Sequence, residues 1–394
     1  MDFNSKDMAE RVIQWSNINS GSYNVLGLER MSVVLSQAFS ELGCEGDLLS
    51  LPPIEQIDAE GVAKKVDLGP LLRFWNRPQA PLQVLLVGHM DTVFPIDHPF
   101  QRAFYKKDNP GILIGPGVAD MKGGLCVILE ALRVFEKSQY AEKLGWELII
   151  NPDEEIGSLA SAPFLNERAK LHHLALLYEP AMDEQGTLAG ARKGSGKFTI
   201  VLHGKAAHAG RDFHLGRNAI CALADVILGL ESLNGQREGV TINIGKVQGG
   251  ESVNVVPDLA IVRIDIRTLK VEDEIWIQNE MDRCLFKVQE QRQVRVECYG
   301  QFTRKPKQLT DKTLKLYELV AELAGREGQD LSWKLSGGCS DGNNLSAAGL
   351  ANVDTLGVCG GGIHSDVEYL MVESLGKRAQ LSFAILSHLS ENGF

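Results

Sequence analysis

The chain has 394 residues, of which 44% are hydrophobic and 23% are charged, an ordinary composition for a globular protein. This length exceeds what a single hydrophobic core usually serves, so we expect two domains. The formal net charge of −11 argues against nucleic acid or an anionic membrane as a partner, because both attract basic surfaces.

The first part of the chain predicts helices that alternate with buried strands. Some segments have apolar residues at helical spacing, whereas short runs such as LQVLLVG are typical of strands buried in a sheet. This alternation predicts a mixed or parallel sheet covered on both faces. The predicted elements are helices at 6–18, 25–43 and 123–137, and strands at 82–88, 146–151 and 174–179.

The pattern changes near residue 193. From there the order of elements is strand, helix, strand, strand, helix, strand (βαββαβ), which is the ferredoxin-like arrangement of an α+β domain. The predicted elements are strands at 197–204, 240–247, 257–268 and 294–302, and helices at 216–234 and 271–290.

After Lys305 and Pro306 the α/β pattern returns. The simplest architecture is one α/β domain, formed by 1–192 and 306–394, that is interrupted by an inserted α+β domain at 193–305. The predicted elements of the last part are helices at 311–327 and 372–389, strands at 331–335 and 353–358, and a glycine-rich turn at 337–342.

The seven cysteines are widely spaced and form no CxxC pair, so neither a disulfide framework nor a structural cysteine–zinc site is indicated. We expect reduced thiols in a cytoplasmic protein. The beginning of the chain lacks the basic and then apolar order of a signal peptide. No apolar run reaches the roughly 18 residues that a membrane span needs.

Histidines and acidic residues fall just past the ends of predicted buried strands, which is where ligands bind in open α/β sheets. The candidates are His89 and Asp91 after strand 82–88, Asp120 in the segment GPGVADMKGG, Glu154 and Glu155 after strand 146–151, Glu179 at the end of strand 174–179, and His364 after the glycines that follow strand 353–358.

These positions differ in what they indicate. A histidine ligand usually needs a group that orients its second ring nitrogen, and Asp91 is a candidate for that role beside His89. Adjacent side chains diverge, so Glu154 and Glu155 are expected to have different roles, one holding metal and the other facing substrate. The sequence alone leaves open which is which. Glu179 adds little by itself.

Other interpretations compete at each position. GPGVAD approaches the GxGxxG pattern, but Asp120 stands where the third glycine would be, which argues against dinucleotide binding. Each acidic residue also fits a solvated loop or the N-terminus of a helix. A common site is favoured because the candidates follow successive strands of one domain.

Two histidines and several carboxylates, without cysteine, predict a site for Zn²⁺, although Mn²⁺ or Co²⁺ would fit the same ligands. A carboxylate has two oxygens. Asp120 could therefore be shared by a pair of ions about 3.5–4 Å apart.

The sequence resembles the M20 metallopeptidase family, which includes glutamate carboxypeptidases, aminoacylases, acetylornithine deacetylase and succinyl-diaminopimelate desuccinylase. The resemblance runs through nearly the whole chain, including the inserted domain. Within the family, the sequence is most similar to the glutamate carboxypeptidase branch. The matching segments are GHMDTVFP, GPGVADMKGG, NPDEEIGS, EPA, GKAAHAG and GIHSDVEY.

The resemblance implies two zinc ions in each subunit. His89 and Glu179 would complete one ion, and Glu155 and His364 the other, with Asp120 bridging them. It also implies that Asp91 orients His89 and that Glu154 is the general base.

In the inserted domain the resemblance implies a lid that also forms a homodimer. His208 of GKAAHAG would stabilise the oxyanion in the active site of the partner subunit. Asn254 and Arg267 match substrate-binding positions, with Arg267 a partner for the substrate carboxylate. Arg304, near the junction of the domains, would be a further binding residue.

The function expected from the resemblance is a metal-dependent carboxypeptidase that releases a C-terminal amino acid, such as glutamate, from a small peptide or an N-acyl conjugate. The alternative within the same chemistry is an N-acyl-amino-acid deacylase. A non-catalytic metal-dependent binding protein would show loss of the base or of ligands, and the sequence retains both. A nicotinamide-dependent dehydrogenase is disfavoured by the missing third glycine and by the inserted domain.

Overall fold

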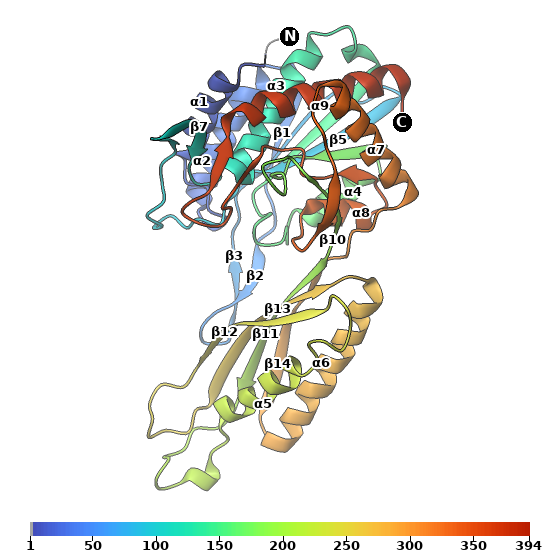
Figure 1. Cartoon of the computed structure of the whole chain (residues 1–394). Coiled ribbons are helices and arrows are strands. Elements are labelled where there is room, and N and C mark those ends of the chain that lie inside the picture. Colours follow the sequence, from blue (N-terminus) through green and yellow to red (C-terminus); the bar gives the residue numbers. More distant parts are fainter. Residues whose placement is uncertain (1–2) are drawn as a thin grey trace. The chain divides into compact units, whose positions relative to one another are not determined.

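The computed structural model describes residues 3–394, which divide into two compact units (Figure 1). Unit 1 takes in the chain up to Ile54, Asp67–Arg192 and Lys307–Phe394. Unit 2 consists of Glu55–Val66 and Lys193–Pro306. The short segment Glu55–Val66 therefore belongs with unit 2, although the sequence predicted 1–192 as one continuous part of the first domain.

Unit 1 is built on a six-stranded sheet in the order β1-β4-β8-β5-β9-β16. The strands β8, β5, β9 and β16 run parallel, whereas β1 and β4 pair antiparallel at one side. Their bounds are β1 Glu45–Leu49, β4 Leu71–Asn76, β5 Leu82–His89, β8 Leu144–Asn151, β9 Leu174–Leu177 and β16 Asn352–Val353.

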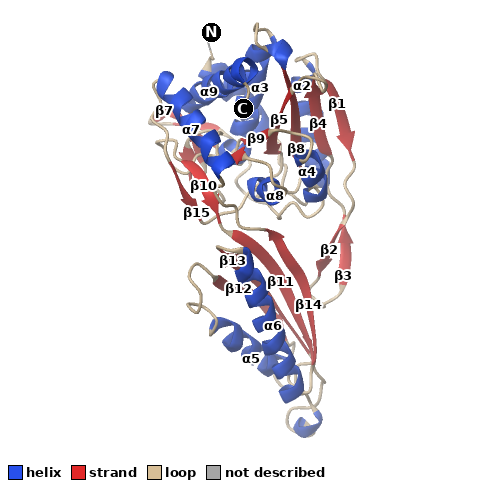
Figure 2. Ribbon diagram, turned by 90° about the vertical axis from the view of Figure 1, so that its right-hand side faces the viewer, coloured by secondary structure: helices blue, strands red, loops and turns tan. Residues whose placement is uncertain are grey.

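Helices cover both faces of this sheet, as the alternating pattern predicts. Val84 and Leu86 of β5 pack into the core that α1, α2, α3, α7 and α9 cover, whereas Leu85 and Val87 face α4 and α8 (Figure 2). The helices are α1 Ser5–Ser16, α2 Val25–Ser40, α3 Gly124–Glu136, α4 Ala162–Ala169, α7 Asp311–Arg326, α8 Asp341–Ala347 and α9 Val372–Asn392.

Two smaller sheets complete unit 1. One has the order β17-β18-β7-β6, and the other pairs β10 with β15. Within the first, β18 pairs antiparallel with β7, so the segment after His364 lies beside the segment before Asp120. The bounds are β6 Phe104–Lys106, β7 Asn109–Ile114, β10 Leu188–Arg192, β15 Trp333–Ser336, β17 Gly360–Gly361 and β18 Tyr369–Met371.

Unit 2 contains an antiparallel sheet in the order β12-β13-β11-β14, with α5 and α6 on one face (Figure 2). The chain order of these elements is βαββαβ, which is the predicted ferredoxin-like arrangement. The bounds are β11 Gly194–His203, α5 Ala219–Glu231, β12 Thr241–Gly249, β13 Leu259–Thr268, α6 Val271–Arg292 and β14 Arg295–Arg304.

The segment Glu55–Val66 reaches unit 2 as a hairpin of β2 Ile54–Ile57 and β3 Ala63–Val66. Its tip lies against the sheet, because the guanidinium of Arg263 donates to the carbonyl of Ile57 at 2.7 Å. A polar and partly exposed hairpin carries no periodic apolar signal, so this contact cannot be predicted from the sequence pattern.

Two predictions near the C-terminal part were wrong in extent. The predicted strand 353–358 is shortened to Asn352–Val353, because Thr355 adopts a φ of 65° and the backbone leaves the extended conformation. The predicted turn 337–342 ends in helix α8, whose first residues are capped by the side chain of Ser340.

Close packing at the start of α3 yields a stability prediction. A Cβ atom on Gly124 would lie 2.1 Å from the carbonyl oxygen of Tyr178. We expect Gly124→Ala to destabilise the fold by about 1–3 kcal/mol in urea unfolding, the usual cost of overpacking. The matched control is Gly325→Ala in helix α7, where a Cβ would meet nothing within 4 Å. That variant should gain up to about 1 kcal/mol, and equal effects of the two would contradict the packing argument.

Candidate metal centre

The candidate residues converge at the carboxyl edge of the parallel strands. His89 is the last residue of β5 and pairs in register with Asn151, the last residue of β8. On the other side of β5, β9 ends at Leu177, two residues before Glu179. Because β8 and β9 lie on the two sides of β5, the residues that follow these three strands meet at one edge of the sheet. This edge of an α/β sheet is where ligands bind.

One group of side chains surrounds the buried imidazole of His89. Its Nε2 lies 3.1 Å from Oδ1 of Asp120 and 3.7 Å from Oε2 of Glu179. The imidazole is 1% exposed. These three side chains come from β5, from the segment before α3 and from the segment after β9, so residues far apart in sequence meet at this point.

A second group surrounds His364. Its Nε2 lies 3.3 Å from Oδ2 of Asp120 and 3.3 Å from Oε2 of Glu155. Asp120 therefore directs one carboxylate oxygen to each histidine. The sequence raised the idea of a shared Asp120, and this geometry is the arrangement that a bridging carboxylate would need.

The separations fit metal ligation. Ligands at about 2.0–2.1 Å from a tetrahedral Zn²⁺ lie about 3.3 Å from one another, close to the distances between the ligand atoms of the two groups. His89, Asp120 and Glu155 offer atoms that all lie within 4.8 Å of one another, and so do His89, Glu154 and Glu179. Proximity alone thus leaves the roles of Glu154 and Glu155 open, but Glu155 is the one that faces His364.

Asp91 contacts both His89 and the loop that carries the two glutamates. Its backbone carbonyl lies 3.0 Å from Nδ1 of His89, and its Oδ1 lies 3.4 Å from the same nitrogen. The carboxylate also accepts hydrogen bonds from the backbone N–H groups of Glu154 and Glu155, and from the hydroxyl of Ser22. Asp91 is therefore more than a partner of His89, because it also fixes the 154–155 backbone. Ser22 was not among the predicted residues, and its position in the sequence does not indicate this contact.

Glu368 was also missed, although it lies within the segment GIHSDVEY. Its buried carboxylate accepts hydrogen bonds from the backbone N–H groups of Gly117, Ala119 and Asp120. Burial raises the pKa of Glu368 to about 8, and the charge of Asp120 adds to this while the N–H donors oppose it. The peptide bond between Asp120 and Met121 is cis.

The glycine run before His364 has a steric explanation. A Cβ on Gly360 would lie 2.1 Å from the carbonyl oxygen of Tyr369, and Gly362 adopts a φ of 64°. His364 itself has a φ of 62°. The tight turn directs the imidazole, which is 53% exposed, toward Asp120 and Glu155.

The electrostatics of the site follow from the crowding of carboxylates. Burial raises the pKa of Glu155 to about 7 and that of Glu179 also to about 7, and Asp120 adds to both shifts. Hydrogen bonds to Asp120 and Glu155 raise the pKa of His364 to about 11. Burial acts to raise the pKa of Asp120, but hydrogen bonds from His364 and His89 outweigh it and hold this pKa below its usual value. A metal ion would replace the protons that these groups hold.

In unit 2, the predicted residues His208 and Asn254 lie next to one another. Ala209 donates to the carbonyl of Asn254 at 2.9 Å, and His208 forms a bridge with Val255. Nδ1 of His208 accepts from the backbone N–H groups of Gly210 and Arg211. An Nδ1 that accepts places the proton on Nε2, so the exposed ring presents an N–H donor.

Arg267 and Arg304 lie on the two strands that flank β11. Both are opposite Ser195, one in β13 and the other in β14. The pairing of β11 with β14 is irregular between Ser195 and Gly196, so Arg304 lies beside a bulge, whereas Arg267 lies in the regular pairing of β11 with β13. Arg267 donates to Asp265 at 2.7 Å, and Arg304 is buried.

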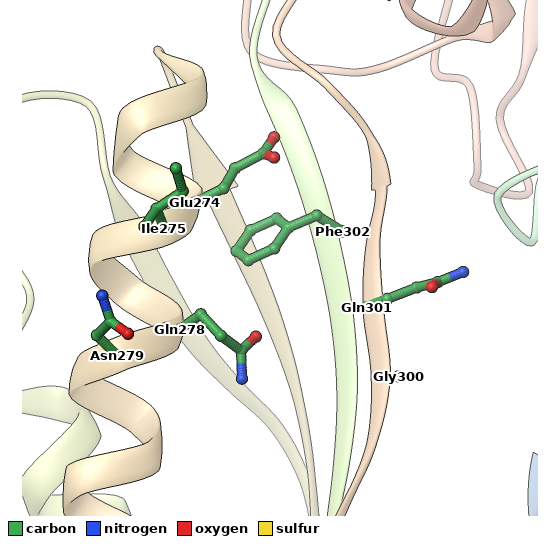
Figure 3. Close-up of a pocket in the computed structure, with 7 residues that line it drawn as sticks. All are labelled: Glu274, Ile275, Gln278, Asn279, Gly300, Gln301 and Phe302. Atoms are coloured by element: carbon green, nitrogen blue, oxygen red, sulfur yellow. The ribbon is translucent and has the colours of Figure 1, made fainter.

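Unit 2 also has a pocket of about 370 Å³ between α6 and β14. Figure 3 shows Glu274 and Phe302 extending toward one another across it, whereas Gln301 points away. Burial raises the pKa of Glu274 to about 7. The groups of potential metal ligands found among residues 3–394 do not include the lining of this pocket, so we place the chemistry at the carboxyl edge in unit 1.

Within the part of the chain that the structure describes, no helix has the length and apolar character to cross a membrane.

The profile of the family described as peptidase family M20/M25/M40 matches residues 85–388.

Relatives and solved structures agree with this match. The chain is 26% identical over 316 residues to carboxypeptidase G2 of Pseudomonas sp. (strain RS-16), covering 78% of this chain and 74% of that protein. It is 26% identical over 344 residues to succinyl-diaminopimelate desuccinylase of Hahella chejuensis, covering 82% and 86%. The crystal structure of the Bacillus subtilis YXEP protein, described as a dinuclear metal binding peptidase, superposes with a TM-score of 0.68 at 17% identity and covers 98% of both chains.

The raised pKa values yield a prediction for metal binding. Below pH 7 the carboxyls of Glu155 and Glu179 hold protons that a metal must displace, and His364 holds one up to about pH 11. We expect the Zn²⁺ affinity of chelator-treated protein, measured by calorimetric titration, to increase from pH 6 to pH 8 with release of protons.

The raised pKa values of Glu155 and Glu179 also determine how the stability of the fold changes with pH. Raised pKa values stabilise the metal-free fold below the unfolded carboxyl value of 4.5, and this stability is lost as the pH rises through about 7. The increase in melting temperature on adding Zn²⁺ should therefore be larger above pH 7 than below it. Asp120→Asn should abolish most of that difference. Metal affinity that does not change with pH would contradict the assignment of these ligands.

Proposed function

The chain belongs to peptidase family M20/M25/M40, and we propose that it is a two-zinc carboxypeptidase that releases a C-terminal amino acid, such as glutamate, from a small peptide or an N-acyl conjugate. Its membership makes it a metal-dependent peptidase or amidohydrolase. The observation that carries the two-metal proposal is Asp120, whose two oxygens face His89 and His364 separately.

The proposed ligand sets follow the two groups of side chains. His89 and Glu179 would hold one ion, Glu155 and His364 the other, and Asp120 both. Mixed nitrogen and oxygen ligation suits Zn²⁺, and Co²⁺ or Mn²⁺ would fit the same set. The relative described as a dinuclear metal binding peptidase supports a pair of ions.

When bound, two such ions lower the pKa of a water molecule and polarise the scissile carbonyl group. Glu154 is then the group that accepts the proton of the attacking water and delivers it to the leaving amine. Asp91 supports this role by holding the N–H group of Glu154, which fixes the backbone of the base. Glu154 is 7% exposed, so its carboxylate is largely withdrawn from solvent.

Unit 2 would supply the groups that bind substrate. The Nε2–H donor of His208 suits an oxyanion, and we propose that it acts in the active site of a partner subunit within a homodimer formed through unit 2. Arg267 and Arg304 both lie opposite Ser195 and would bind the substrate carboxylate, with Asn254 beside His208 as a further hydrogen-bonding group. A cytoplasmic location is part of the same proposal.

A deacylase of N-acyl amino acids is the second candidate, and the similarity to succinyl-diaminopimelate desuccinylase favours it. Both candidates leave a free amino acid, so they differ in the acyl side of the scissile bond. A panel of dipeptides, N-acyl glutamates, and N-acetyl and N-succinyl amino acids separates them by kcat/KM. Two equivalents of bound metal without turnover of any amide would instead favour a binding protein.

Two matched substitutions distinguish the proposed role of Glu154 as base from that of Glu155 as metal ligand. We expect Glu154→Gln to lower kcat by about 10²- to 10⁴-fold, the usual contribution of general-base catalysis, while the protein retains both metals. Glu155→Gln should instead lower the bound metal, measured by elemental analysis after dialysis. Wild-type turnover in the Glu154→Gln variant would rule out its role as base.

The carboxylate-binding role of Arg267 is tested with a matched pair of substrates. A charged hydrogen bond is worth about 1.5–3 kcal/mol, so Arg267→Ala should raise KM for a free-carboxylate substrate by roughly 10- to 150-fold. It should have little effect on the corresponding C-terminal amide. Arg283→Ala is the control, because Arg283 is exposed on α6 and pairs with Glu280 of the same helix. Equal effects of both variants would exclude specific recognition by Arg267.

A further inference from the structure

Glu368 links the segments that carry two of the proposed ligands. It lies four residues after His364, directly before β18, and is 1% exposed. Its Oε1 accepts the N–H groups of Ala119 at 2.9 Å and of Asp120 at 3.0 Å, and its Oε2 accepts that of Gly117 at 3.0 Å. One carboxylate therefore binds three donors of the loop that ends at Asp120.

The backbone reinforces this contact. Gly115 donates to the carbonyl oxygen of Glu368 at 3.1 Å, and Tyr369 pairs with Ile114 where β18 meets β7. The loop from Gly115 to Asp120 is thus held at both ends against the segment that follows His364. With both oxygens engaged, the Glu368 carboxylate has only one orientation that satisfies all three donors.

The buried side chain of Lys122 holds the chain just after Asp120. The Nζ of Lys122 donates to the carbonyls of Trp15 at 3.2 Å and Ile18 at 2.9 Å.

We propose that Glu368 is a positioning residue for the proposed metal ion between His364 and Asp120, because its hydrogen bonds set the distance between the segments that carry them. This inference rests on the proposed two-metal function. The ion between His89 and Glu179 depends on other contacts, since His89 is the end of β5 and Asp91 binds the 154–155 loop. Because Asp120 is shared, loss of Glu368 should weaken both ions, but it should weaken the ion at His364 more, since Glu368 links the segments that carry both His364 and Asp120.

The test compares two buried glutamates. Glu368→Gln keeps the shape of the side chain but replaces one acceptor oxygen by an NH2 group, which cannot accept a hydrogen bond from a backbone N–H. Glu147→Gln is the control, because Glu147 is 3% exposed in β8 and pairs with Arg73 and Arg168 instead of the site. Bound Zn²⁺ is counted after dialysis and titrated by calorimetry, Co²⁺ absorption reports the ligand geometry, and the melting temperature of the metal-free protein reports folding.

We expect Glu368→Gln to bind one of two ions about 10- to 100-fold more weakly, as is usual when a group behind a ligand is removed. Its Co²⁺ spectrum should change, whereas Glu147→Gln keeps two ions of wild-type affinity even if its melting temperature falls. Glu368→Asp, which retains the carboxyl group with a shorter reach, should show the same selective loss and serves if Glu368→Gln does not fold.

Four results would overturn the inference. Wild-type affinity for both ions in the Glu368 variants excludes a positioning role, and equal loss of both ions, or the same loss in Glu147→Gln, assigns the effect to general destabilisation. A wild-type protein that binds fewer than two ions refutes the proposed function itself and removes the basis for the inference. The wild-type count thus separates failure of the function from failure of the role of Glu368.

Discussion

The carboxylate of Asp120 lies between two imidazoles, with Oδ1 3.1 Å from His89 and Oδ2 3.3 Å from His364. This contact imposes two requirements on unit 1. The end of a buried central strand and an exposed loop must reach the same carboxylate from opposite sides. The backbone around Asp120 must also accept a conformation with little freedom, because a displacement of about 1 Å in either direction would lengthen one of these contacts beyond hydrogen-bonding distance.

Crowding of carboxylates is the cost of this arrangement, and the surrounding structure offsets it in two ways. Burial and mutual repulsion raise the pKa of Glu155 and of Glu179 to about 7, so protons or metal ions must compensate the charge. Backbone N–H groups donate hydrogen bonds to the carboxylates of Asp91 and Glu368 and so offset part of their negative charge. Each of these two carboxylates follows a histidine in sequence and binds the loop of a different ligand, so the two histidine segments are cross-linked to the acidic loops.

The sequence predicted the parts of this site that depend on periodicity. Buried strands such as β5 and β8 are recognisable as apolar runs, and a polar residue at their ends marks the carboxyl edge. His89 and the loop that carries Glu155 lie at the ends of these strands. Features that depend on short-range geometry have no such signal: Thr355 turns the chain out of the predicted strand, and the side chain of Arg263 in unit 2 donates to the backbone carbonyl of Ile57 in the hairpin. Glu368 was missed for the same reason, because hydrogen bonds to backbone N–H groups leave no pattern in the sequence.

The two histidines differ in how their positions are determined. His89 is 1% exposed and ends a strand that is paired on both sides, so the sheet itself fixes its backbone. His364 is 53% exposed and lies in a turn with a positive φ, where regular hydrogen bonding does not constrain it. A ligand in such a turn needs an additional contact to hold it within the tolerance of metal coordination. The pairing of β18 with β7 and the three hydrogen bonds of Glu368 supply that contact, which is why a buried glutamate four residues downstream matters to an exposed histidine.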